Sequence, residues 1–125
     1  MKELTRAEEQ IMQILWASKE GFVNDILDHF SDPKPAYNTV STITRILVKK
    51  GFVGFHSLGK AHKYYPLVSK QEYTRNYFRR FVKNYFGNSY QEMVSFFTRE
   101  ENLSLEEMEE IRQIMKKEIK KQKGK

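Results

Sequence analysis

Apolar residues recur at helical spacing through the first part of the chain. In the first predicted helix they share one face, formed by Leu4, Ile11, Ile14 and Leu15. The same spacing predicts helices over residues 5–18, 24–30 and 37–50. These segments end at Gly21, at the two prolines of residues 31–35 and at Gly51, because glycine and proline interrupt helices. The N-terminal part of the chain is therefore predicted to contain three short helices.

Two strand-like runs follow the third predicted helix. Residues 52–56 and 61–65 are rich in aromatic side chains, and Gly59 lies between them in a position that suits a tight turn. They are predicted to pair as a β-hairpin. Three helices followed by a hairpin are the element order of a winged helix. Residues 1–68 are therefore predicted to form a winged helix-turn-helix domain.

The rest of the chain is predicted to be helical throughout, over residues 69–86, 89–99 and 104–122. Ser/Thr-x-x-Glu boxes mark the start of the first helix and of these three, because in such a box the hydroxyl and the carboxylate can each bond a free backbone amide. The boxes are Thr5 to Glu8, Ser69 to Glu72, Ser89 to Glu92 and Ser104 to Glu107. The fold class is thus mostly α with a small β-hairpin, and residues 69–125 form a second, three-helix domain.

The three C-terminal helices carry more apolar surface than they can bury among themselves. We expect the surplus to pack against a second copy of the chain, which makes this domain a dimerisation domain. The candidate interface residues are Tyr77, Phe78, Phe81, Phe97, Leu105, Met108, Ile111 and Met115. The alternative is that these side chains form a core with the N-terminal domain.

The distribution of charge adds information about the middle of the chain. The net charge is +6, and Glu72 is the one acidic residue between Pro33 and Gln91, a stretch with eleven lysines and arginines. Surfaces that only need to be solvated usually mix both signs, so this depletion indicates a polyanionic partner. The alternative is a basic surface without a partner.

Composition also excludes several classes of protein. The sequence has no cysteine, which excludes disulfides, thiolate metal sites and cysteine nucleophiles. It has no apolar run of the roughly 18 residues that a membrane span needs, and it begins with a helix signal, so a cytoplasmic protein is expected. No nucleophile lies at motif spacing from a base and no glycine-rich phosphate loop is present. We therefore expect neither an enzyme nor a cofactor or small-molecule substrate.

The third predicted helix carries the most informative chemistry. Val40, Ile43 and Leu47 fall on one side of it. The opposite arc, called the outer face below, holds Asn38, Ser41, Thr42, Arg45 and Lys49. Such side chains can bond base edges or phosphates, whereas an ordinary surface helix would carry glutamate here. With Tyr37 and Thr39 at its first turn, this helix is predicted to be a recognition helix for double-stranded DNA.

The hairpin adds Lys60, His62 and Lys63, which are expected to lie along the DNA backbone. A metal site at His56 and His62 would lack a third ligand of clear spacing, so no metal is expected. A winged helix that binds a protein partner is the alternative function. Such a protein would tolerate acidic residues on the outer face, and this sequence has none there.

Four motifs resemble those of the BlaI/MecI family of penicillinase repressors, and together they span nearly the whole chain. They are Leu4-Thr5-x-Ala7-Glu8-x-x-Ile11-Met12-x-x-Leu15-Trp16, then Tyr37-Asn38-Thr39-Val40-Ser41-Thr42-Ile43 leading to Lys50-Gly51-Phe52-Val53, then Gly59-Lys60-Ala61-x-x-Tyr64-Tyr65-Pro66-Leu67, and Glu101-Asn102-Leu103-Ser104.

The resemblance implies a homodimeric repressor of antibiotic-resistance genes that reads operator DNA. It further implies a membrane sensor protease as a partner and cleavage of the repressor in the helix before the last one. The matching bond is Phe96 to Phe97. The best-known members carry Asn at the position of Phe96, and basic residues at the positions of Asn38 and Ser41.

Overall fold

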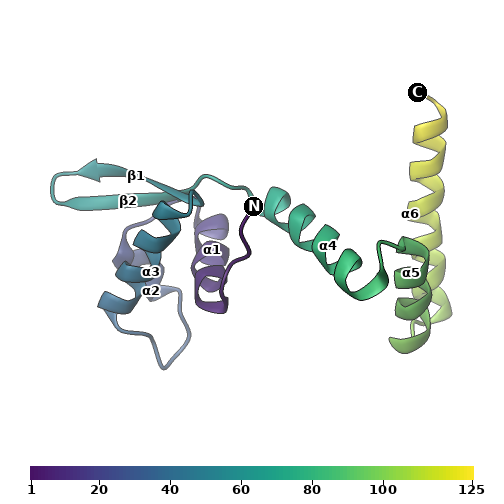
Figure 1. Cartoon of the computed structure of the whole chain (residues 1–125), viewed down its shortest axis with the longest axis horizontal. Helices are drawn as coiled ribbons and strands as arrows, with labels where there is room; N and C mark the ends of the chain where they lie inside the picture. The colour runs from purple at the N-terminus through teal and green to yellow at the C-terminus, as the bar shows by residue number, and fades with distance from the viewer. The chain divides into compact units, whose positions relative to one another are not determined.

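The computed structural model describes all 125 residues as six helices and one hairpin (Figure 1). In chain order the elements are α1 (Arg6–Ser18), α2 (Val23–Asp28), α3 (Tyr37–Lys49), β1 (Val53–Leu58), β2 (Ala61–Pro66), α4 (Lys70–Phe86), α5 (Tyr90–Glu100) and α6 (Leu105–Lys123). The predicted fold class, mostly α with a small β-hairpin, is confirmed.

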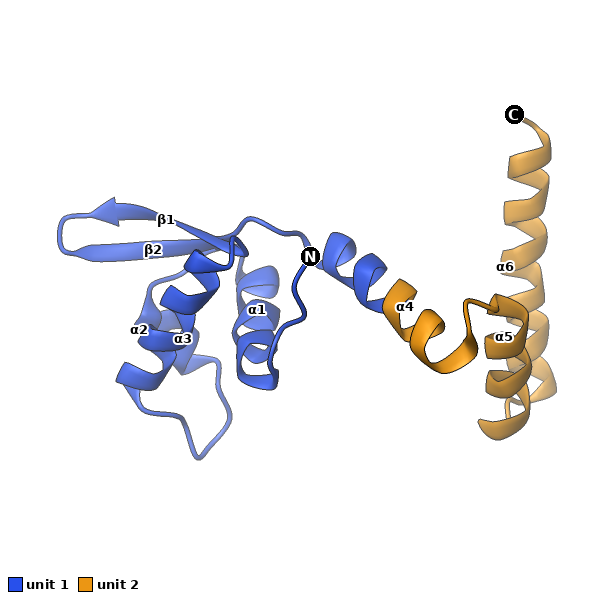
Figure 2. Cartoon of the chain, in the orientation of Figure 1, with its two compact units in different colours: residues 1–78 blue, residues 79–125 orange.

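The chain divides into two compact units, residues 1–78 and 79–125 (Figure 2). The division falls within α4, so the first turns of this helix pack with the N-terminal unit. The predicted domain boundary, between residues 68 and 69, remains a prediction.

The core of the N-terminal unit comes from α1, α2, α3, the hairpin and the start of α4. Its buried side chains are Leu4, Ile11, Met12, Leu15, Val23, Ile26, Val40, Leu47, Phe52, Val53, Tyr64 and Tyr73. Ile14 and Ile43, predicted to face the core, are partly buried against it. The helical face inferred from apolar spacing is thus the face that packs.

Hydroxyl caps begin four of the helices, as the Ser/Thr-x-x-Glu boxes predict. The boxes of Thr5 with Glu8 and of Ser104 with Glu107 are complete, with both reciprocal bonds present. The hydroxyls of Ser69 and Ser89 accept from the amides of Glu72 and Glu92 at 3.0 and 3.1 Å. Each cap satisfies an amide that has no partner inside its own helix.

The hairpin is longer and its turn tighter than the sequence predicts. Leu58 pairs with Ala61, so the turn consists of Gly59 and Lys60, with Gly59 at a φ of 65°. Phe52, predicted to be in the first strand, precedes β1 instead. Its ring is buried and its carbonyl accepts from the Leu67 amide at 2.8 Å. We call the hairpin of β1 and β2 the wing.

The second helix ends two residues earlier than predicted, at Asp28. The amides of His29 and Phe30 bond the carbonyls of Ile26 and Leu27, three residues back, which tightens the last turn. The Lys34 ammonium then donates to three carbonyls there, at 3.4 Å from that of Leu27, 2.9 Å from that of Asp28 and 3.0 Å from that of Phe30. This cation satisfies the free end of α2.

Tyr73 joins the start of α4 to the N-terminal unit. Its hydroxyl accepts from the Leu4 amide at 3.2 Å, and its ring lies 5.8 Å from that of Trp16 and 6.0 Å from that of Phe52. The Trp16 indole donates to the Val68 carbonyl at 2.8 Å. These contacts hold the segment between the wing and α4 in place.

The C-terminal unit contains the rest of α4, together with α5 and α6. Val82 is its one buried hydrophobic residue, and Phe86 packs against Phe96 with ring centroids 5.6 Å apart. None of the helices combines the length and the apolar character that crossing a bilayer would require.

Candidate nucleic-acid interface

The outer face of α3 is a continuous polar and basic surface. Asn38, Thr42, Arg45 and Lys49 are exposed on it and Ser41 is half-buried. None of these side chains is acidic, so nothing on this face would repel a phosphate backbone.

The inner face of α3 fixes the helix against the core. Val40 and Leu47 are buried, and so is Thr44, whose hydroxyl donates to the Val40 carbonyl at 2.7 Å. This bond satisfies the hydroxyl within its own helix, which allows a polar residue on an apolar face.

An ion pair holds the C-terminal end of α3 against the start of α1. The Lys50 ammonium lies 2.8 Å from each oxygen of the Glu8 carboxylate, and Glu8 is buried. Lys50 is consequently engaged inside the domain, whereas Lys49 is exposed.

A hollow of about 540 Å³ lies between α3, the wing and the start of α2. Five predicted DNA contacts line it together, namely Tyr37, Ser41, Arg45, Lys60 and His62. The structure therefore brings α3 and the wing to one site, although Tyr37 and His62 lie 25 positions apart in the sequence.

The side of this hollow formed by α2 was not among the predicted contacts. Phe22, Asn24 and Asp25 line it, and the Asp25 carboxylate accepts from the Phe22 amide at 2.8 Å. The one available signal for a surface role is the polar pair at the start of a short helix.

Tyr64 connects the wing to α3 at the floor of the hollow. It is buried, and burial raises the pKa of its phenol, an effect that the nearby positive charge of Arg45 partly offsets. The phenol is therefore neutral near pH 7. The charge of Arg45, on α3, thus acts on a residue of the wing.

Ring stacking stiffens the wing beyond its backbone pairing. His62 stacks on Phe55 at 4.4 Å with an interplanar angle of 11°, and His56 stacks on Tyr65 at 4.8 Å. The two histidines thus lie against different aromatic partners. No group of three or more His, Cys, Asp or Glu side chains in the structure could hold a metal ion.

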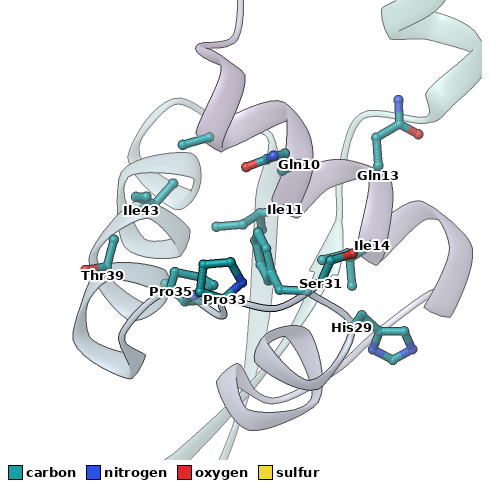
Figure 3. A pocket seen from close by; sticks show the side chains of 13 residues that line it. Gln10, Ile11, Gln13, Ile14, His29, Ser31, Pro33, Pro35, Thr39 and Ile43 are labelled. Atoms are coloured by element: carbon teal, nitrogen blue, oxygen red, sulfur yellow. The ribbon is translucent and has the colours of Figure 1, made fainter.

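Two of the residues predicted to contact DNA lie outside this hollow and have other neighbours. Lys63 forms an ion pair with Glu20 at 3.1 Å. Thr39 lines a different hollow of about 560 Å³, together with Gln10 of α1 and Pro33 (Figure 3). That hollow is mostly apolar in lining and contains no acidic, lysine or arginine side chain.

The candidate dimerisation residues all expose large apolar side chains, from 37% for Phe81 and Ile111 to 75% for Leu105. They are Tyr77 and Phe78 in the first unit, and Phe81, Phe97, Leu105, Met108, Ile111 and Met115 in the second. The candidate cleavage bond lies within α5, and its two residues, Phe96 and Phe97, are 49% and 40% exposed.

Comparison with known proteins gives consistent matches over nearly the full chain. Residues 4–117 match the family model described as "Penicillinase repressor". The methicillin resistance regulatory protein MecI of Staphylococcus aureus (strain N315) is 29% identical over 116 residues, which cover 92% of this chain and 94% of that protein. The penicillinase repressor of Bacillus licheniformis is 25% identical over 114 residues, covering 90% and 89%.

Among solved structures, the solution structure of the DNA binding domain of the repressor BlaI matches with a TM-score of 0.50 at 25% identity. The match covers 58% of this chain and 94% of that domain.

Proposed function

The chain belongs to the penicillinase repressor family, a family of transcriptional repressors rather than enzymes, and from this premise we propose that it is a homodimer that represses resistance genes by binding operator DNA. The observation that carries the proposal is the hollow shared by α3 and the wing. It gathers Tyr37, Ser41, Arg45, Lys60 and His62 from two elements at one exposed, acid-poor site.

The proposed binding mode assigns different roles to α3 and to the wing. The outer face of α3 enters the major groove, where Asn38 and Arg45 have the side chains that read base edges in pairs of bonds. Lys60 and His62 of the wing lie along the sugar-phosphate backbone, where contacts add affinity without reading sequence. Such a protein acts in the cytoplasm, the compartment expected from its sequence.

The proposed dimer rests on the C-terminal unit. Its helices leave large apolar side chains in contact with water, and in a single soluble chain such a surface normally meets a partner. A second copy supplies the same surface, so the contact closes as a two-fold pair. Two recognition helices then read two half-sites.

The proposed release step is proteolysis of α5 between Phe96 and Phe97 by a membrane sensor protease. Both side chains are about half exposed, so a protease can reach the bond once this part of the helix opens. Cleavage separates α6 from the rest of the chain and so removes most of the proposed interface.

The experiment is a DNA-binding titration at several salt concentrations, with genomic fragments as the source of operators. With 6 to 10 phosphate contacts, affinity should fall on the order of 10³ to 10⁵ between 50 and 200 mM salt. Footprints should show two half-sites about one helical turn apart. A flat salt response, or protection of one unpaired half-site, would contradict the proposal.

A further inference from the structure

Lys63 differs from the other wing lysine in its surroundings. Its ammonium lies 3.1 Å from a carboxylate oxygen of Glu20 and 5.7 Å from the ring centroid of Phe22. Lys60, in contrast, lines the hollow beside α3 at the tight turn of the wing. To bind a phosphate, Lys63 would have to share its ammonium with this carboxylate or release it.

Backbone bonds bring Glu20 and Phe22 beside the wing. The Gly21 amide donates to the Tyr64 carbonyl at 2.9 Å, and the Tyr64 amide donates to the Gly21 carbonyl at 2.8 Å. Gly21 and Tyr64 therefore form an isolated antiparallel β-bridge at the edge of β2. In such a pair, Phe22 lies opposite Lys63, and Glu20 lies diagonally from it on the same face.

Lys63 does not share the surroundings of its two neighbours in β2. His62 and Tyr64 both line the hollow beside α3. Lys63 lies between them in the sequence but does not line the hollow, and its ammonium pairs with Glu20 instead. Its cross-strand neighbour is His56.

The segment 20–22 leads directly into α2, whose first residues form one wall of the same hollow. The wing forms another wall. Any contact between this segment and β2 therefore helps to set the distance between α2 and the wing.

We infer that Lys63 is a positioning residue, which acts with Glu20 and Phe22 to hold the wing at its angle to α2 and α3 and does not itself contact DNA. This inference rests on the proposed function, because its consequence is a wing placed to contact a DNA backbone. Lys60 and His62 then provide the contacts of the wing with phosphates.

The test uses full-length variants and a mixed-sequence duplex of about 30 base pairs, and it measures how binding affinity depends on salt concentration. Each phosphate contact adds about 0.9 to the slope of log affinity against log salt. Lys60→Ala should lower this slope by about 0.9. Lys63→Ala and Glu20→Gln should leave the slope unchanged and each weaken binding roughly two- to fivefold at fixed salt, as expected for an exposed ion pair.

Lys63 and Glu20 should also act through one shared interaction. The double variant of Lys63→Ala with Glu20→Gln should bind no more weakly than either single variant, and the exchange Glu20→Lys with Lys63→Glu should restore binding. Lys2→Ala removes the same charge at an exposed position away from the wing and serves as the control. Thermal unfolding of every variant separates a displaced wing from a destabilised domain.

A slope lowered by Lys63→Ala as much as by Lys60→Ala, together with tighter binding by Glu20→Gln, would overturn the inference in favour of a phosphate contact. Binding unchanged by both Lys63→Ala and Glu20→Gln would overturn it as well. Failure of the proposed function has a different signature, because the wild-type protein itself would then show no salt-dependent binding to the duplex.

Discussion

At the scale of single residues, Glu8 shows how one buried charge links two helices. It is 4% exposed, yet burial, which alone would raise the pKa of its carboxyl group, is outweighed by hydrogen bonds from Lys50 and the Thr5 amide and by the charge of Lys50. The net effect lowers this pKa from its ordinary value of 4.5. The charged form therefore stabilises the fold above pH 4.5, and this contribution is lost as the pH falls through the lower, folded-state pKa.

Replacing Glu8 with Gln should test this contribution. The amide keeps an oxygen for the Thr5 amide but loses the charge that pairs with Lys50, so we expect the free energy of unfolding at pH 7 to fall by about 1 to 3 kcal/mol. Urea unfolding should show the gap to wild type narrowing as the pH drops below about 4.5. Glu9→Gln, one residue along, is the control. A gap independent of pH would mean that the charge is not what Glu8 contributes.

In the proposed binding mode Arg45, which is exposed on the outer face, reads a base. Replacing it with Ala should weaken binding to the preferred operator by about 1 to 3 kcal/mol and leave binding to unrelated duplexes less affected. Selection from a randomised pool, followed by sequencing, measures the change in preference. Arg6→Ala, on α1, removes the same charge elsewhere in the unit. An equal loss on all sequences would assign Arg45 to the backbone instead.

The outer face could be predicted because it depends only on the 100° step between successive residues of one helix. The pairs Glu8 with Lys50 and Glu20 with Lys63 could not, because they join segments whose meeting depends on the tertiary fold. The burial of Thr44 was not predicted for a different reason: its side chain is polar by type, but its hydroxyl is satisfied within the same helix by the Val40 carbonyl.

At the scale of elements, the sequence predicts all six helices and the hairpin in the right order. Their ends are accurate where a local device defines them, as at the Thr5 and Ser104 boxes. They are less accurate at the C-terminus of α2, where the defining cation, Lys34, comes from the following loop. The family predicted from the four motifs is confirmed, since the family model covers residues 4–117.

The start of α4 offers an element-scale test, because Tyr73 anchors it beside the single tryptophan, Trp16. Tyr73→Phe keeps the packing and removes the bond to the Leu4 amide, so it should destabilise the unit by about 1 kcal/mol. Tyr73→Ala also removes the ring and should cost about 3 to 5 kcal/mol. Tryptophan fluorescence should shift to longer wavelength in the Ala variant and stay unchanged in the Phe variant. Identical spectra for Tyr73→Ala and wild type would show that α4 is not held there.

At the scale of the whole molecule, the two units differ in how they bury apolar residues. The N-terminal unit has a contiguous core, whereas α5 and α6 contain no buried residue at all. The sequence predicts the surplus of apolar residues in this part. It does not distinguish coverage by the other unit from coverage by a second chain, because both arrangements would give the same spacing of apolar residues.

A chain ending at Phe96 tests what the C-terminal surface contributes to operator binding. It lacks α6 and the last turn of α5, and with them the exposed side chains Met108, Ile111, Met115 and Ile119. Burying each of these in an interface is worth roughly 1.5 to 3 kcal/mol before ordering costs, so their loss should shift dimerisation by several powers of ten.

The shortened chain should therefore be a monomer that holds one half-site. Two linked half-sites bind far more tightly than one, so operator affinity should collapse although every residue of α3 and the wing is intact. Light scattering gives the mass and fluorescence anisotropy the affinity. Met115→Glu in the full-length chain, which places a charge in the same surface without shortening the protein, should produce the same two losses. A shortened chain that stays dimeric and binds its operator at nanomolar concentration would separate release from dimer dissociation, and repression would then have to be lifted by another step.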